Sequence, residues 1–274
     1  MSNTGAATTN MAPFRLGWTE RASIRLQRAR RWEFWPGWLF YIPIVLWILL
    51  LGLRYRHWTL FTAVNPGMDN GSVVGERKSR MLLVLQQQFP AALPHTQLLV
   101  REHSAAMQQL AQLAQDSGWP LVLKPDIGQR GRGVAVIHNP QQAEAYLRSA
   151  NFDIVAQAFA GGEEFGVFVR RLPQTEEFEI SSITHKILPT LRGDGSSTVA
   201  ELIRTHSRAR LGAETLFRQH RQQLGKVLER GETFALVELG AHCRGAEFRD
   251  AQDCFSPALQ ARIQMICAAL PGFD

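Results

Sequence analysis

One stretch of the chain combines a lysine, three glycines and two arginines in a pattern that suits phosphate binding. In LVLKPDIGQRGRGVAVI, residues 121–137, a short apolar strand ends at Lys124 and a loop with glycines at 128, 131 and 133 follows. Glycines allow backbone N–H groups to approach an anion closely, and basic side chains add positive charge for a polyphosphate. The Walker pattern GxxxxGK[ST] is missing from the loop, and a strand follows it. Taken alone, the stretch also fits an ordinary glycine-rich hairpin with solvated arginines.

Two later segments carry polar residues at informative spacing. In DIVAQAFAGGEEFGVFV, residues 153–169, Gln157 and Glu164 flank a connector between two predicted strands. Glu164 follows Gln157 by seven positions, so each end of a connector about as long as a nucleoside carries a polar group. In HKILPTLRGDGSSTVAELI, residues 185–203, a basic pair precedes a turn and a helix capped by Ser or Thr.

The elements that must position these residues alternate between strands and helices. Apolar patterning predicts strands over 121–124, 133–138, 153–159, 163–171, 177–187 and 233–241, and helices over 79–89, 102–117, 140–149, 198–206, 213–230 and 257–270. Hairpin-like strands mixed with helices favour the α+β class. Along the chain we expect a basic region (1–33), an apolar segment (34–53), a linker with the first helix (54–90) and a catalytic domain (91–274).

In type and order, the three motifs resemble the ATP-grasp superfamily of carboxylate–amine ligases, over residues 80–274. The resemblance implies two α+β subdomains that clasp ATP, and a reaction through an acyl phosphate. It implies that Lys124 holds the α- and β-phosphates and that the loop Gly128–Gly133, with Gln129, Arg130, Gly131 and Arg132, closes as a lid. Ala158 and Phe159 would meet the adenine edge, Gln157 stands where many relatives have Glu, Glu164 would bind the ribose hydroxyls, and Lys186 would contact phosphate or adenine.

The resemblance also implies an acceptor side and magnesium. Arg192 and the GDG turn would line the acceptor side, and His242 and Arg244 would face the acyl phosphate. His242 fits a buried structural histidine equally well. Relatives hold two Mg²⁺ ions with Asp, Glu and Asn after the last helix, where this chain offers Asp274. We therefore expect a shortened metal site, weakened nucleotide binding and little turnover. The alternatives are a nucleotide-binding or regulatory module without ligase activity, and a kinase.

The net charge of +6 belongs to the first 60 residues, which carry eight arginines and two glutamates. The remainder is neutral, which argues against a nucleic-acid partner. Cys243, Cys254 and Cys267 lack the spacing of a zinc site or a disulfide framework.

Residues 34–53 form a charge-free apolar segment, FWPGWLFYIPIVLWILLLGL, with arginines on both flanks. A helix of this length matches the thickness of a bilayer core, and tryptophans gather at its front end. A membrane segment is the prediction, with a buried core helix as the alternative. Because both flanks are basic and Pro36 and Pro43 interrupt the segment, a re-entrant form that bends near Pro43 competes with a single span. The expected partners are ATP, a carboxylate, an amine and membrane lipid, with the catalytic domain on the cytoplasmic face of a bacterial-type inner membrane.

Overall fold

The computed structural model describes residues 14–101, 105–129, 131–238, 240 and 245–273. Contacts divide the chain into two compact units. Unit 1 comprises Met1–Phe40 with Leu188–Glu247, and unit 2 comprises Tyr41–Ile187 with Phe248–Asp274. The mixture of helices and sheets predicted from the sequence is confirmed.

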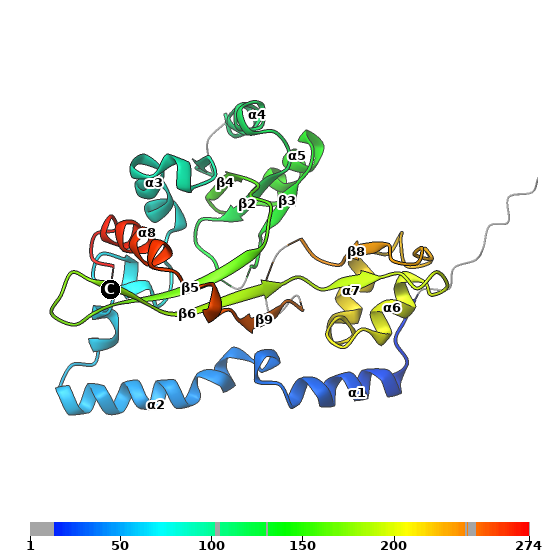
Figure 1. Cartoon of the computed structure of the whole chain (residues 1–274), viewed down its shortest axis with the longest axis horizontal. Coiled ribbons are helices and arrows are strands. Elements are labelled where there is room, and N and C mark those ends of the chain that lie inside the picture. The colour runs from blue at the N-terminus through cyan, green and yellow to red at the C-terminus, as the bar shows by residue number, and fades with distance from the viewer. Residues whose placement is uncertain (1–13, 102–104, 130, 239, 241–244, 274) are drawn as a thin grey trace, which may run out of the picture. The chain divides into compact units, whose positions relative to one another are not determined.

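A four-stranded antiparallel sheet forms the first layer of unit 2, in the order β1-β4-β2-β3. Its strands are β1 (Thr96–Leu99), β2 (Leu121–Pro125), β3 (Ala135–Ile137) and β4 (Ile154–Ala158). Helices α4 (Ala106–Ser117) and α5 (Pro140–Ser149) cover one face of this sheet (Figure 1). Leu121 and Leu123 are fully buried against these helices. Because side chains alternate along a strand, Lys124 points to the opposite face.

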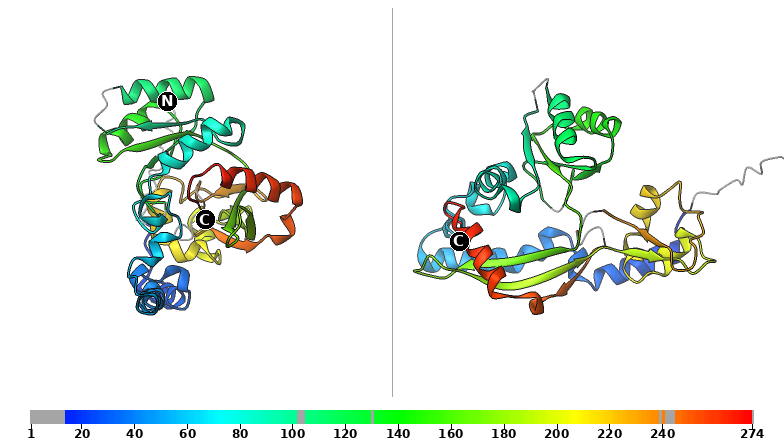
Figure 2. Two further views of the ribbon diagram at one scale, coloured as in Figure 1. Left: turned by 90° about the vertical axis from the view of Figure 1, so that its left-hand side faces the viewer. Right: turned by 45° about the horizontal axis from the view of Figure 1, so that its top comes forward.

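The second sheet of unit 2 has the order β5-β6-β9. Strands β5 (Glu164–Arg171) and β6 (Phe178–Ile187) form a long hairpin, and β9 (Glu247–Asp250) adds a short third strand. Helix α8 (Pro257–Ala268) packs on β6 through Leu259 and Ile263 (Figure 2). The side chain of Gln260 accepts the N–H of Ile180 at 3.1 Å. The helix therefore binds the strand through both apolar packing and hydrogen bonds to the backbone.

Unit 1 is built from chain segments that are distant in sequence. Helix α1 (Trp18–Ala29) joins α6 (Val199–Thr205), α7 (Ala213–Gln219) and the two-stranded sheet of β7 (Thr190–Arg192) and β8 (Thr233–Ala235). Their shared core includes Leu16 from before α1 together with Val199, Ile203 and Leu216. Thr198 caps α6 and shares a capping box with Glu201, which explains why the helix begins at Val199.

Helix α2 (Gly37–Tyr55) contains the apolar segment and runs unbroken past Pro43. Proline lies in its second turn, and the structure shows no end of the helix there. The helix is long and apolar enough to cross a membrane, which is by itself weak evidence that it does. The remaining helical elements are α3 (Lys78–Gln88) and the short 3-10 turns η1 (Trp32–Phe34), η2 (Leu60–Ala63), η3 (Asp69–Ser72), η4 (Pro90–Ala92), η5 (Ala209–Gly212) and η7 (Gln252–Cys254).

The helix predicted over 213–230 is wrong beyond Gln219. Leu224 and Leu228 are buried, and their four-residue spacing imitates a helix period. Their carbonyls instead accept the N–H groups of Ala200 and Gly195, so this segment runs as turns and a single bridge from Val227 to Thr198 beside the start of α6. Of the strand predicted over 233–241, the described residues form only β8, which ends at Ala235, and residues 239 and 241 lie outside the described part.

The core of the four-stranded sheet predicts a large effect for one residue of α4. Leu113 is fully buried, and Met107 on the same helix is 37% exposed. We expect Leu113→Ala to lower the free energy of unfolding by about 2–5 kcal/mol, because it leaves a cavity in a close-packed core. Met107→Ala, the matched control, should change it by less than about 1 kcal/mol. Denaturant unfolding of both variants measures the difference, and equal values would contradict the assigned packing.

Candidate functional site

Lys124 lies at the end of β2 and takes part in a polar network across three strands. Its Nζ donates to Oε1 of Gln157 on β4 at 2.9 Å, and Nε2 of Gln157 donates to the hydroxyl of Thr96 on β1 at 2.8 Å. Burial lowers the pKa of Lys124, and the positive charge of Lys78 lowers it further. The structure thus brings together Lys124 and Gln157, two residues of the expected nucleotide site whose roles stay predictions.

Lys78 is a site residue that the sequence analysis missed. It opens α3, and its Nζ donates to the carbonyls of Asp126 at 3.1 Å and Gly128 at 2.8 Å. Burial lowers its pKa, while Asp126 and Glu76 oppose that shift. A lysine in the first turn of a helix is unfavourable for the helix dipole, and this is the one sequence signal that could have singled it out.

The neighbouring Ser79 fixes the start of the glycine loop. Its N–H and its hydroxyl donate to the two carboxylate oxygens of Asp126 at 2.7 and 2.9 Å. Asp126 is 4% exposed, so this pair of hydrogen bonds is shielded from water. Ser79 thus binds both oxygens of Asp126, and within the described ranges this carboxylate forms no direct ion pair with either lysine.

The two lysines therefore form a cationic centre. Within the residues that the structure describes, neither Nζ has a carboxylate oxygen in ion-pair contact, and their partners are an amide and two carbonyls. Two partly desolvated ammonium groups that repel one another are unfavourable until an anion approaches. This arrangement can hold a ligand with several negative charges.

The loop Gly128–Gly133 lies beside this cationic centre and is held at both ends. Its carbonyl at Gly128 accepts from Lys78, and its carbonyl at Gly133 accepts from the hydroxyl of Tyr146 at 2.6 Å. Burial raises the pKa of Tyr146 to about 12. Gly131 and Gly133 have φ of 67° and 73°, and a Cβ at Gly133 would lie 2.6 Å from Pro125. Glycine is thus required at Gly133.

Between its anchored ends, the loop presents polar side chains to solvent. Gln129 and Arg132 are exposed, and Ile127 before them is 52% exposed. Arg130 lies outside the described residues. The anchored ends and exposed middle suit a segment that folds over a ligand, and its role as a lid stays a prediction.

The connector after β4 differs in one respect from the expected adenine site. The N–H of Ala158 donates to the carbonyl of His95 at 2.9 Å, and the N–H of Phe159 donates to that of Pro120 at 3.3 Å. Both amides are therefore occupied within the protein, and neither is available as the donor to adenine. Only the carbonyls of these two residues could serve as adenine contacts.

Glu164 and Lys186 are brought together by the β5–β6 hairpin. They are direct cross-strand neighbours and form an ion pair. Next to them, Phe165 and His185 stack with ring centroids 4.6 Å apart. The hairpin therefore carries a polar pair beside an aromatic pair. Their contacts with ribose and phosphate stay predictions.

The residues predicted for the acceptor side are distributed differently. Arg192 is exposed at the end of β7 in unit 1, whereas Lys124 belongs to unit 2. The carboxylate of Asp194 in the GDG turn accepts hydrogen bonds from the N–H groups of Ser196 and Ser197 at 2.8 and 2.7 Å. Bonds from the Ser196 and Ser197 backbones and hydroxyls lower the pKa of Asp194, so this acid shapes its own turn. His242, Arg244 and Asp274 lie outside the described residues.

The described residues do not fit the expected magnesium site. No group of three His, Cys, Asp or Glu side chains in this part of the chain is arranged to hold a metal ion. Asp126 is occupied by Ser79, and Glu164 by Lys186. We therefore derive no step through a metal.

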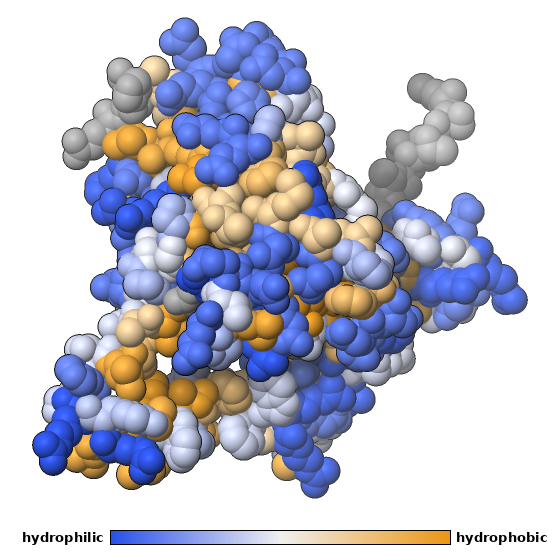
Figure 3. Space-filling view, turned by 60° about the vertical axis from the view of Figure 1, so that its left-hand side comes forward, coloured by the Kyte–Doolittle hydropathy of each residue, from blue (hydrophilic) through white to orange (hydrophobic). Residues whose placement is uncertain are grey.

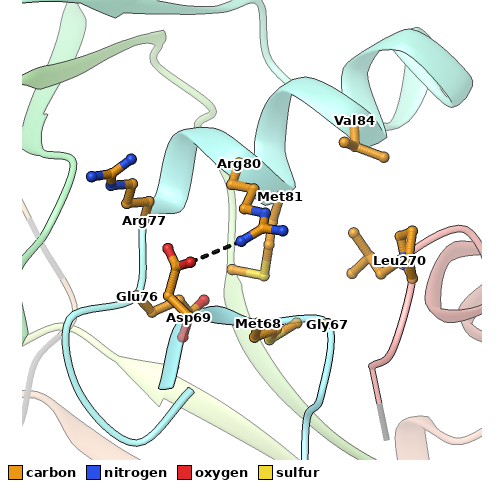
Figure 4. Close-up of a pocket in the computed structure, with 10 residues that line it drawn as sticks. Gly67, Met68, Asp69, Glu76, Arg77, Arg80, Met81, Val84 and Leu270 are labelled. Carbon is orange, nitrogen blue, oxygen red and sulfur yellow. Dashed lines mark hydrogen bonds and ion pairs between the residues drawn. The ribbon is translucent and has the colours of Figure 1, made fainter. Parts of the chain in front are cut away.

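A cavity near α3 is too small to hold a nucleotide. It has a volume of about 110 Å³ and is lined by Met81 and Val84 of α3, by Met68 and by Leu270 near the end of the chain (Figure 4). Arg80 points to Asp69 at its side and pairs with it at 2.8 Å. Pockets for small molecules are usually several-fold larger, about 300 Å³ or more. This cavity lies between α3 and the segment around Leu270.

Comparison with known proteins yields structural likeness only. No protein-family model and no curated protein sequence matches the chain. Among solved structures, a bifunctional glutathione synthetase from Pasteurella multocida is 16% identical over 71% of this chain and 28% of its own, with a TM-score of 0.33. D-alanine–D-alanine ligase from Bacillus anthracis is 12% identical over 71% and 46%, with a TM-score of 0.39. A RimK domain ATP-grasp protein from Sphaerobacter thermophilus is 16% identical over 71% and 68%, with a TM-score of 0.28.

These similar structures are ATP-grasp ligases, the superfamily that the sequence motifs resemble. The chain spans less than half the length of the first two. The likeness concerns chain arrangement at low TM-scores.

The lowered pKa of Lys124 predicts a pH-dependent stability difference. A lysine whose pKa falls on folding binds fewer protons in the folded state, so it destabilises the fold at low pH and ceases to do so as pH rises to about 10.5. Relative to the wild type, Lys124→Met should therefore be most stable near pH 7 and lose that advantage towards pH 10.5. Denaturant unfolding across this range measures it.

The matched control is Lys226→Met, which removes an exposed lysine paired with Glu232 in unit 1. The free energy of unfolding of this control, relative to the wild type, should not show the advantage near pH 7 that Lys124→Met loses towards pH 10.5. A pH-independent difference for Lys124→Met would contradict the desolvated environment assigned to this lysine.

Proposed function

We propose that the Lys124 site binds ATP and that the protein is a membrane-associated, ATP-dependent carboxylate–amine ligase of the ATP-grasp type. The observation that carries the proposal is the cationic centre of Lys78 and Lys124. Both lysines are partly buried, both have a lowered pKa, and a glycine loop begins beside them. A triphosphate would bring negative charge into direct contact with the two ammonium groups, which no carboxylate among the described residues does.

The chemistry of the centre suits a polyphosphate better than a carboxylate alone. Lys124 and Lys78 approach one region from β2 and α3, so two separate phosphate groups of one ligand can be contacted. Ammonium groups bind phosphate as point charges, and partial burial strengthens that attraction. Ligand charge would also return the pKa of both lysines towards their ordinary values, so binding takes up protons at alkaline pH.

The proposed reaction has two steps. An oxygen of the substrate carboxylate attacks the γ-phosphorus of ATP, the bond from that phosphorus to the β–γ bridging oxygen breaks, and ADP leaves. The nitrogen of an amine then attacks the acyl carbon, phosphate leaves, the nitrogen loses a proton and an amide forms. Lys124 and Lys78 would orient the phosphates and offset the charge that develops on them. The loop Gly128–Gly133 would exclude water from the acyl phosphate.

The sugar and base would lie along the β4 connector and the β5–β6 hairpin. Gln157 links this region to Lys124 through its side-chain amide, so the base end and phosphate end share one network. Glu164 would turn from Lys186 to the ribose hydroxyls when the nucleotide binds. Arg192, His242 and Arg244 complete the proposal on the acceptor side.

Membrane association is the second part of the proposal, and helix α2 supports it. Twelve large apolar or aromatic side chains of this helix are exposed, namely Trp38, Leu39, Tyr41, Ile42, Ile44, Val45, Leu46, Trp47, Leu49, Leu50, Leu53 and Tyr55. An exposed apolar surface of this extent is typical of a site that contacts a membrane or another protein. Because ATP is cytoplasmic, the catalytic unit would face the cytoplasm and act on an envelope-linked, lipid-linked or peptide-like acceptor.

The test of nucleotide binding compares two lysines in the full chain kept in detergent or nanodiscs. We expect Lys124→Met to raise the Kd for ATP about 10- to 100-fold, because a charge-assisted hydrogen bond contributes about 1.5–3 kcal/mol. Lys226→Met should leave the Kd unchanged. Titration calorimetry measures both, and an unchanged Kd for Lys124→Met would overturn the phosphate role.

Activity is tested separately from binding. Full chain, ATP and pools of amino acids or peptides are incubated, and mass spectrometry follows ADP, phosphate and new amides. An amide formed with release of ADP and phosphate supports the ligase. ATP binding without turnover in every pool favours the nucleotide-binding module, and a phosphorylated product that persists marks a kinase.

A further inference from the structure

Helix α1, which precedes α2, packs against residues that follow α2 by more than a hundred positions. Arg21 pairs with Glu214 at 3.1 Å, and Glu20 pairs with Arg204 at 3.5 Å. Leu16 is 7% exposed and lies in the same core cluster as residues of α6 and α7. The segments before and after α2 thus form one folded body, unit 1.

The attachment reaches almost to the start of α2. Arg208 contacts Glu33 at 2.9 Å, and the two side chains are only 16% and 15% exposed. Arg208 also donates to the carbonyls of Gly245 and Ala246. Glu33 precedes Gly37, the first residue of α2, by one helical turn of chain. A partly buried, multiply bonded arginine therefore holds the front end of α2 at the surface of unit 1.

The middle of α2 exposes apolar side chains around its whole circumference. Ile44, Val45, Leu46 and Trp47 are between 42% and 62% exposed. Consecutive helical residues are about 100° apart, so these four positions sample the whole circumference. In Figure 3, orange hydrophobic and white residues lie side by side in the lower part of the view, with blue hydrophilic residues next to them. A helix with apolar side chains on all sides is more stable in lipid hydrocarbon than in water.

A single crossing of the membrane is incompatible with this packing. Were α2 to span the bilayer, α1 would lie on one face and everything after Tyr55 on the other. In the described part of the chain α2 is the one helix long and apolar enough to cross a membrane, so no second helix is present there to bring the chain back to the first face. The internal gaps in that part are at most four residues long, too short for a further crossing. Residues 188–247 could then never reach α1, with which they share a core.

We propose that α2 enters one leaflet of an anionic bilayer and does not cross it, so that both of its ends return to the same face. The proposal rests on the membrane association proposed above. A helix is about 10–12 Å wide, and one leaflet contributes about 15 Å of hydrocarbon, so an apolar helix fits parallel to the membrane plane. No bend at Pro43 is needed, in agreement with the unbroken helix.

The two ends of α2 carry the same kind of side chains, as one interface requires. Trp32 and Trp38 at the front are 57% and 71% exposed, and Tyr55 and Trp58 at the back are 55% and 59% exposed. Arginines accompany both groups, Arg30 and Arg31 in front and Arg54 and Arg56 behind. Aromatic rings and arginines favour the anionic headgroup layer. If the helix crossed the membrane, one of these arginine-rich ends would lie on the non-cytoplasmic side, where Lys and Arg are rare next to membrane segments.

The test is the sidedness of two single cysteines in the full chain. In a variant with Cys243→Ser, Cys254→Ser and Cys267→Ala, either Ser23→Cys on α1 or Ser207→Cys after α6 is introduced; both serines are exposed. A membrane-impermeant maleimide is added to intact spheroplasts and to inverted inner-membrane vesicles. We expect both positions to be labelled in inverted vesicles and neither in spheroplasts. Labelling of the two positions from opposite faces would overturn the proposal.

Two further measurements guard against misfolded variants and against exchange between chains. Epitope tags at the two ends of the otherwise unchanged chain should be accessible to antibody from the same membrane face. Arg21→Cys with Glu214→Cys, joined by a short bismaleimide, should cross-link within one chain. A cross-linked dimer would instead mean that α1 packs on a second copy, and it would overturn the proposal.

Flotation separates this inference from the proposed function. The full chain is mixed with vesicles of phosphatidylglycerol and phosphatidylethanolamine, and with vesicles of phosphatidylcholine alone. Enrichment on the anionic vesicles supports the assigned lipid surface. A chain that binds neither overturns membrane association and this inference together, while ATP binding at Lys124 is judged by its own titration.

Discussion

The partial burial of Lys124 without an acidic partner is the constraint on which the candidate site depends. Lys124 lies near the end of β2, on the face of the strand opposite to the buried leucines. Its ammonium group donates a hydrogen bond to the side chain of Gln157, which is neutral and leaves the charge of the lysine in place. Lys78 adds a second positive charge from α3. A fold gains nothing from two such cations by themselves, since surface exposure would cost less. The arrangement becomes favourable when an anion with several charges lies between them, which is why ligand binding explains it better than stability does.

Asp126 has a structural part beside the two lysines. Among the described residues, its carboxylate forms no direct ion pair with Lys78 or Lys124. Ser79 instead occupies both of its oxygens. The acid thereby fixes the loop to α3, while its charge acts on Lys78 at longer range. The glycine loop is anchored at Gly128 by Lys78 and at Gly133 by Tyr146.

Local patterns predicted much of unit 2, because its strands and helices follow from period, turns and caps. The strand ending at Lys124, the helix opened by Pro140 behind its Asn139 cap, and the β5–β6 hairpin all lie where alternation and helix signals place them. The sequence did not single out Lys78, because its position beside Lys124 depends on the contact of α3 with the residues after β2. No local pattern predicts a contact between such distant segments. The end of α7 was misjudged for the same reason. Leu224 and Leu228 have helical spacing, yet their carbonyls bind the backbone at Ala200 and Gly195.

The order of synthesis bears on how α2 meets the membrane. Unit 1 cannot form until residues 188–247 exist, since Leu16 and Ile24 have no core to join before then. By that time α2 has long been made, and an early crossing would leave α1 on the wrong face. A helix that settles in one leaflet avoids this conflict, because α1 stays within reach of α6 and α7 throughout. The buried Arg208–Glu33 pair then completes unit 1 at the start of α2. Folding of the discontinuous unit and shallow insertion of the helix are thus mutually consistent, whereas folding and a crossing are not.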